Sequence, residues 1–173
     1  MKGLIFVAYR EAIIKKFDSK VWFSIFEKSS FPKEFPLLKT EIYDDKYFFE
    51  LLEISAKELN VEYNDLYELF AEYFLNEYVP KNLFYVVENI RSSRDMFRNL
   101  DLIHEILSLS ASLELIPRFE YTEADDAKEA ILIYKSQRKL YDLFYIMTKT
   151  VCEKYGDCRI ERVASEKLKI VYK

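Results

Sequence analysis

The stretch Asn99-Leu100-Asp101-Leu102-Ile103-His104-Glu105-Ile106-Leu107 contains the only histidine of this 173-residue chain. Apolar residues and this histidine recur at the spacing of three and four that forms one face of a helix. The residues on that face are Phe97, Leu100, His104, Leu107 and Ala111. We therefore expect a helix over about 94–111, with His104 pointing into apolar surroundings. Both a core histidine with an internal hydrogen bond and a metal ligand fit this spacing.

Composition and charge exclude several classes of partner. Half of the residues are hydrophobic and 17% are aromatic, which suits a wide internal cavity as well as a dense core. The net charge of −4 gives no electrostatic case for binding nucleic acid. No apolar run approaches the roughly 20 residues that a membrane span needs. The N-terminus has no small-residue cleavage site, so we expect a cytoplasmic protein that binds neither nucleic acid nor a membrane.

The two cysteines, Cys152 and Cys158, have a spacing that matches neither a C-x-x-C redox pair nor half of a zinc finger. A single histidine also excludes most zinc geometries. We interpret both cysteines as structural residues in a reducing cytoplasm.

The first two thirds of the chain has the periodicity of helices. Helices are predicted over about 3–17, from Asp18 or Ser19 to about 28, from Asp44 or Asp45 to about 59, from Asn64 to just before Pro80, over about 81–90, and over about 94–111. The first three are separated by polar capping residues and by a loop with two prolines.

The last third changes character. Short segments rich in β-branched and aromatic residues predict strands over about 118–122, 128–135, 159–163 and 167–172, with a helix over about 139–155. Helices followed by a small antiparallel sheet indicate an α+β fold. Gly3 and Gly156 are the only glycines, which excludes glycine-rich phosphate loops.

A second candidate site is Tyr134-Lys135-Ser136-Gln137-Arg138. In an extended chain Tyr134, Ser136 and Arg138 project to one face, at the end of a buried strand. A phenol, a hydroxyl and a guanidinium are costly to bury unpaired, and a carboxylate ligand would satisfy all three. The alternative is a strand end that frays into solvent.

These segments together resemble the H-NOX family, the haem–nitric oxide/oxygen binding domains related to the sensor domain of soluble guanylate cyclase. The resemblance covers essentially the whole chain. It rests on Met1-Lys2-Gly3, Arg98-Asn99-Leu100-Asp101-x-Ile103-His104, Pro117-Arg118-Phe119 and Tyr134-x-Ser136-x-Arg138. It implies one domain over residues 1–173, with a helical distal part over about 1–63, a proximal part with the sheet over about 64–173, and haem b between them.

The resemblance also implies roles for individual residues. His104 matches the proximal ligand of the haem iron, and Tyr134, Ser136 and Arg138 match the residues that hold the haem propionates. Pro117 matches a proline that packs on the porphyrin and helps to distort it. The remaining residues assigned to the haem pocket are Ile5, Phe74, Leu143 and Met147.

Leu143 departs from the pattern of the oxygen-binding members. In the oxygen-binding members of the family that the chain resembles, a tyrosine stands at this position and donates a hydrogen bond to bound dioxygen. With Leu143 we expect a protein that binds nitric oxide and carbon monoxide but not dioxygen to a useful extent. Tyr9 and Tyr145 are the other phenols that we consider as donors to the gas.

The family implies a sensor without catalytic turnover. Nitric oxide weakens the bond between iron and His104, and the helix that carries His104 then loses its anchor. The expected partner is a separate signalling protein, such as a sensor histidine kinase or a cyclic-di-nucleotide enzyme. The alternatives are a dioxygen sensor, a haem-free helical interaction module, and an enzyme that uses haem or a thiol.

Overall fold

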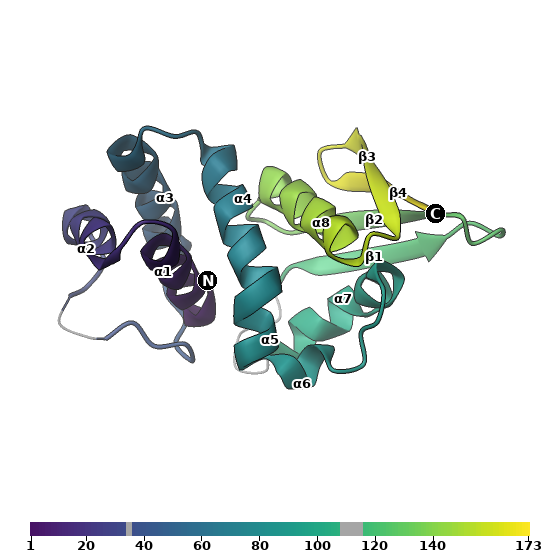
Figure 1. Cartoon of the computed structure of the whole chain (residues 1–173), viewed down its shortest axis with the longest axis horizontal. Coiled ribbons are helices and arrows are strands. Elements are labelled where there is room, and N and C mark those ends of the chain that lie inside the picture. Colours follow the sequence, from purple (N-terminus) through teal and green to yellow (C-terminus); the bar gives the residue numbers. More distant parts are fainter. Residues whose placement is uncertain (34–35, 108–115) are drawn as a thin grey trace. The chain divides into compact units, whose positions relative to one another are not determined.

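The computed structural model describes residues 1–33, 36–107 and 116–173. The chain forms two compact units, which we call unit 1 (Met1–Phe74) and unit 2 (Leu75–Lys173). Figure 1 shows that unit 1 is built of helices and that unit 2 contains the sheet. The boundary at Phe74 lies later in the chain than the expected division near residue 63. Within the described ranges, no helix is long and apolar enough to cross a membrane.

Unit 1 contains helices α1 (Gly3–Lys16), α2 (Ser19–Lys28), α3 (Asp45–Leu59) and α4 (Tyr63–Tyr73). The carboxylate of Asp18 accepts a hydrogen bond from Val21 N (2.9 Å), and that of Asp44 accepts one from Lys46 N (2.9 Å). Both predicted caps are therefore confirmed. The helix expected to start at Asn64 begins at Tyr63 instead, so Asn64 is not its cap, and Asp65 accepts a hydrogen bond from Glu62 N (2.9 Å).

The core of unit 1 consists mainly of aromatic rings that pack edge to face. The rings of Phe6 and Tyr9 each lie 5.7 Å from that of Phe48, centroid to centroid. Gly3 has a steric reason to lack a side chain, because a Cβ there would lie 1.9 Å from the carbonyl oxygen of Leu38. The glycine thus allows α1 to approach the loop that precedes α3.

Unit 2 begins with short helical segments. A π-helical turn (Phe74–Tyr78) crosses the boundary and leads into α5 (Val79–Asn82), α6 (Phe84–Val87) and α7 (Ser93–Leu107). The expectation that Pro80 ends a helix is wrong. Pro80 lies in the first turn of α5, where a missing N–H costs little. The predicted helix over 94–111 is confirmed as far as Leu107, and its last residues, with Ala111, lie outside the described ranges.

The sheet of unit 2 is antiparallel throughout. Strands β1 (Arg118–Glu123), β2 (Glu129–Lys135), β3 (Cys158–Ala164) and β4 (Lys167–Tyr172) pair in the order β1-β2-β4-β3. Alternate residues of β2 and β4, among them Leu132 and Leu168, are fully buried. Helix α8 (Tyr141–Tyr155) packs against β3, and α7 packs against β1. The α+β fold predicted from the sequence is confirmed.

The cysteines form a disulfide, with 2.05 Å between the sulfur atoms of Cys152 and Cys158. The expectation that both cysteines are structural agrees with this bond, whereas the pairing itself was not predicted. The turn from α8 into β3 brings the two Cα atoms to 5.1 Å, within the range that a disulfide spans. The spacing of the two cysteines alone does not indicate this turn.

Candidate functional site

Helix α7 positions His104 through contacts at its start and its middle. Ser92 Oγ accepts a hydrogen bond from Asp95 N (3.0 Å), which caps the helix. Further along, Asp101 accepts hydrogen bonds from Phe119 N (2.8 Å) and from the guanidinium of Arg118 (2.5 Å). The turn of α7 that precedes His104 is thereby attached to the start of β1.

The hydrogen bond of His104 defines its tautomer. Nδ1 lies 2.8 Å from the carbonyl oxygen of Leu100, and a carbonyl can only accept. Burial lowers the pKa of His104, and this favours the neutral imidazole. The hydrogen bond to Leu100 O and the charge of Asp101 offset part of this effect. In a neutral ring with its proton on Nδ1, Nε2 carries the lone pair. Among the described residues Nε2 has no hydrogen-bond partner, so it is available to a metal ion.

A path of aromatic rings connects His104 with Tyr134. The ring of Phe119 lies 4.6 Å from that of His104 and 5.5 Å from that of Tyr134, centroid to centroid. Phe119 and Tyr134 are paired across β1 and β2. Phe144 of α8 stacks on Tyr134 at 5.3 Å. The two predicted sites, far apart in the sequence, thus lie on either side of one phenylalanine.

Tyr134, Ser136 and Arg138 interact with one another. Burial raises the pKa of Tyr134, and the hydroxyl of Ser136 and the charge of Arg138 act against this rise. The backbone N–H of Arg138 donates to Ser136 Oγ at 3.2 Å. A phenol, a hydroxyl and a cation therefore gather at the end of β2.

The extended course predicted for this segment is wrong beyond Lys135, where β2 ends. The hydroxyl of Ser136 binds the backbone two residues ahead, a local contact that favours a turn. Lys139 then adopts a left-handed conformation with φ of +51°. Ser136 and Arg138 therefore lie in a turn between β2 and α8 rather than on a strand face.

The remaining predicted residues are apolar and belong to both units. Pro117 lies just before β1 and is partly exposed. Leu143 and Met147 are half-buried and one turn apart on α8, whereas Ile5 is partly exposed on α1 and Phe74 stacks on Phe70 at 5.3 Å. That these side chains line one haem pocket stays a prediction.

The two alternative phenols lie in different units and in different surroundings. Tyr9 is fully buried in the core of unit 1, and this burial raises its pKa. Ser55, whose hydroxyl donates to Leu51 O (2.7 Å), lies near the phenol of Tyr9 and acts against this rise. The guanidinium of Arg162 lies over the ring of Tyr145, with its Cζ 4.5 Å from the ring centroid.

Asp101, Phe119 and Phe144 are site residues that sequence reasoning missed. Asp101 and Phe119 stand inside the segments singled out above, but their contacts are long-range. The structure also has a groove of about 520 Å³ between α3 and α4, and no predicted site residue lines it. In the described ranges, no group of three His, Cys, Asp or Glu side chains is placed to hold a metal ion.

Comparison with known proteins identifies the family. The family model described as Haem-NO-binding matches residues 2–164. An oxygen-binding H-NOX domain related to soluble guanylate cyclases, solved as its oxygen complex, has a TM-score of 0.85 at 15% identity, covering 100% of this chain and 95% of the other.

Two further H-NOX structures have the same fold. The Fe(II)NO form from S. oneidensis has a TM-score of 0.81 at 17% identity and covers 99% of this chain and 98% of the other. The unliganded Fe(II) form from K. algicida has a TM-score of 0.75 at 20% identity and covers 99% and 95%. This chain therefore belongs to the Haem-NO-binding (H-NOX) family of haem-based gas-sensor domains.

Proposed function

We propose that this protein is a nitric oxide sensor in which His104 is the one protein ligand of a haem b iron. The observation that carries this proposal is the hydrogen bond from Nδ1 of His104 to Leu100 O, 2.8 Å long. It orients the ring and keeps the lone pair on Nε2, as second-shell partners do for metal-bound histidines. A haem held in this way would supply a ferrous iron that can bind a diatomic gas.

The chemistry of the residues around His104 fits a haem. A porphyrin offers an apolar ring and two carboxylates. Phe119 gives apolar surface next to His104, Pro117 lies two residues before it in the chain, and Tyr134, Ser136 and Arg138 give donors for carboxylates. The first group would contact the ring, and the second would hold the propionates.

The side chains at positions 143, 9 and 145 support nitric oxide rather than dioxygen as the gas. Bound dioxygen carries partial negative charge and gains from a hydrogen-bond donor, which nitric oxide does not need. Leu143 has no donor to offer, Tyr9 is enclosed in the core of unit 1, and Tyr145 stacks with Arg162. Carbon monoxide binds under the same conditions.

Helix α7 is the element through which we expect the signal to pass. It carries His104 and is attached to β1 by the hydrogen bonds of Asp101 to Arg118 and Phe119. A displacement of His104 therefore acts on both α7 and the sheet. We infer that a separate signalling protein, of the histidine kinase or cyclic-di-nucleotide enzyme type, responds to this displacement and that the sensor itself has no catalytic turnover.

Absorption spectra of the reduced protein test this function. We expect a five-coordinate ferrous haem that binds nitric oxide and carbon monoxide and forms no stable complex in air. A stable oxygen complex contradicts the proposed selectivity and indicates a dioxygen sensor. A colourless protein whose spectrum stays unaltered when haem is added contradicts haem sensing and indicates a helical interaction module.

A further inference from the structure

The Cys152–Cys158 disulfide ties together the two sides of one turn. Cys152 lies in the last turn of α8, and Cys158 is the first residue of β3. Between them, Gly156 has a left-handed conformation with φ of +70°, and its N–H donates to Cys152 O at 2.8 Å. Cys152 and Cys158 are 4% and 6% exposed. The disulfide and this hydrogen bond therefore both constrain the conformation of the turn.

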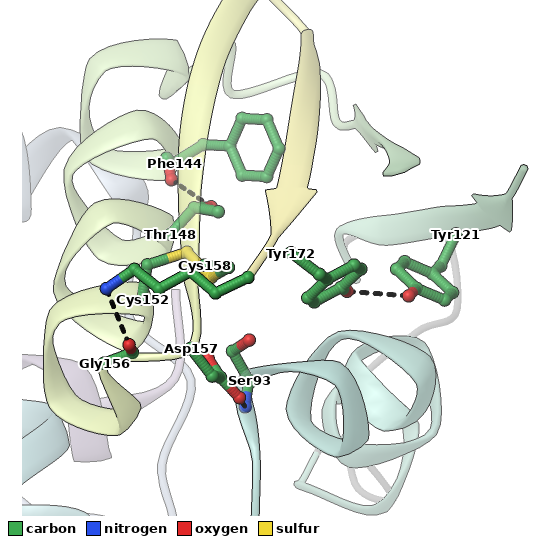
Figure 2. Close-up of a disulfide and its surroundings, with 10 residues drawn as sticks. Ser93, Tyr121, Phe144, Thr148, Cys152, Gly156, Asp157, Cys158 and Tyr172 are labelled. Carbon is green, nitrogen blue, oxygen red and sulfur yellow. Dashed lines mark hydrogen bonds between the residues drawn. A yellow bond between two sulfur atoms is a disulfide. The ribbon is translucent and has the colours of Figure 1, made fainter. Parts of the chain in front are cut away.

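This turn presents Asp157 to the first residue of α7. Figure 2 shows Asp157 between the disulfide and Ser93. Oδ2 of Asp157 accepts a hydrogen bond from Ser93 N at 3.0 Å, although 64 residues separate the two in the sequence. The first N–H groups of a helix have no partner within it, and a carboxylate there also interacts favourably with the helix dipole. The helix that carries His104 thus has a cap that comes from the disulfide turn.

Two polar atoms at this cap lack hydrogen-bond partners within the described ranges, so the position of Asp157 depends on the bonds that hold the turn. Oδ1 of Asp157 and Oγ of Ser93 are buried and have no hydrogen-bond partner among the described residues. A buried carboxylate oxygen without a partner is costly and favours any rearrangement that returns it to water. The disulfide next to Asp157, and the hydrogen bond from Lys173 N to Asp157 O (3.0 Å), oppose that rearrangement.

We propose that the Cys152–Cys158 disulfide is a redox-modification site whose reduction loosens the N-terminal turn of α7. The reductant is a dithiol. One of its thiolates attacks a sulfur of the disulfide and displaces the other cysteine as a thiolate, which takes up a proton. The second thiol of the reductant then resolves the mixed disulfide. The protein gains two electrons and two protons, and the dithiol leaves as its own disulfide.

Reduction acts on α7 through Asp157. Without the covalent link the turn keeps hydrogen bonds such as that from Lys173 Nζ to Gly156 O (2.8 Å), but Asp157 can move away from Ser93. Because the cysteines are buried, exchange with the dithiol requires local opening of the turn. The consequence for haem rests on the function proposed above: a looser α7 holds the imidazole of His104 less firmly.

Hydrogen exchange of the full chain tests the proposal, with dithiothreitol as the reductant. We expect the amides of Ser93 to Phe97 to exchange roughly tenfold faster in the reduced protein, as for the loss of one hydrogen bond. The same increase is expected in a Cys152→Ser/Cys158→Ser variant, and reoxidation of the wild type reverses it. The amides of α3 in unit 1 serve as the internal reference and stay unchanged.

Two aspartate variants separate the cap from the covalent link. Asp157→Ala, with the disulfide intact, is expected to speed exchange at Ser93 as reduction does. Asp142→Ala is the matched control, because Asp142 of α8 forms a surface ion pair with Arg162 of β3, and we expect it to leave α7 unchanged. Equal exchange of α7 in oxidised and reduced protein overturns the proposal, as do two free thiols in protein purified without a reductant.

The test remains informative whatever becomes of the haem. Exchange at Ser93 reports on the redox site in haem-free protein too. A colourless protein that still shows the tenfold change supports the redox site while contradicting the sensor function. In haem-loaded protein, faster haem loss after reduction is the second expected readout.

Discussion

The two units differ in the burial and polarity of the side chains predicted to form the site. Unit 1 has a core of enclosed rings, such as those of Phe6 and Tyr9, which are 0% exposed. In unit 2 the side chains of His104, Ser136 and Arg138 are only partly buried. The predicted site residues of unit 1, Ile5 and Phe74, are apolar. The difference teaches that the polar members of the predicted site all belong to unit 2, whereas the members predicted from unit 1 are apolar.

The largest effect expected in unit 2 comes from Arg138→Leu. Loss of a charge-assisted hydrogen bond to a propionate weakens haem binding by roughly 10- to 100-fold. Transfer of haem to an acceptor protein measures the rate of loss. Arg159→Leu is the matched control, because Arg159 is exposed and pairs with Glu161 in the same unit. Equal rates in the two variants would count against a haem-binding role for Arg138.

Leu143→Tyr adds a phenol donor to a half-buried position of α8. We expect the variant to bind dioxygen at least roughly tenfold more tightly than the wild type, as one hydrogen bond to a partly charged ligand allows. Spectra recorded against oxygen concentration measure this. Leu143→Phe adds the ring without the hydroxyl and should leave oxygen binding weak. If the phenylalanine variant gains as much, the hydroxyl is not the cause.

Gly3→Ala sharpens the comparison by perturbing unit 1 alone. A Cβ would lie 1.9 Å from Leu38 O, so backbone must shift, and we expect a loss of about 1–3 kcal/mol in the free energy of unfolding. Urea denaturation followed by circular dichroism measures it. An unchanged midpoint would mean that the close approach of α1 to this loop is absent in solution.

Gly156→Ala is the counterpart in unit 2 and should have a smaller effect. No atom lies within 4 Å of a Cβ built there, so the cost comes only from the left-handed backbone with φ of +70°. We expect about 1 kcal/mol. The same denaturation experiment checks this value. A loss larger than that of Gly3→Ala would reverse the expected order of the steric and the conformational cost.

Local signals predicted more than long-range ones did. Asp18 and Asp44 cap their helices as expected, because a cap acts within three residues along the chain. The turn after Lys135 was missed, since the hydroxyl of Ser136 binds the backbone where strand alternation predicted an extended chain. Asp101 and Asp157 act on residues 17 to 64 positions away, and no local pattern encodes such contacts.

The absorption spectrum of reduced His104→Gly protein, before and after addition of imidazole, tests the central claim most directly. If Nε2 of His104 is the protein ligand of iron, the variant loses the wild-type coordination, and free imidazole restores it by taking the vacated place. A variant that keeps the wild-type spectrum without imidazole contradicts the account.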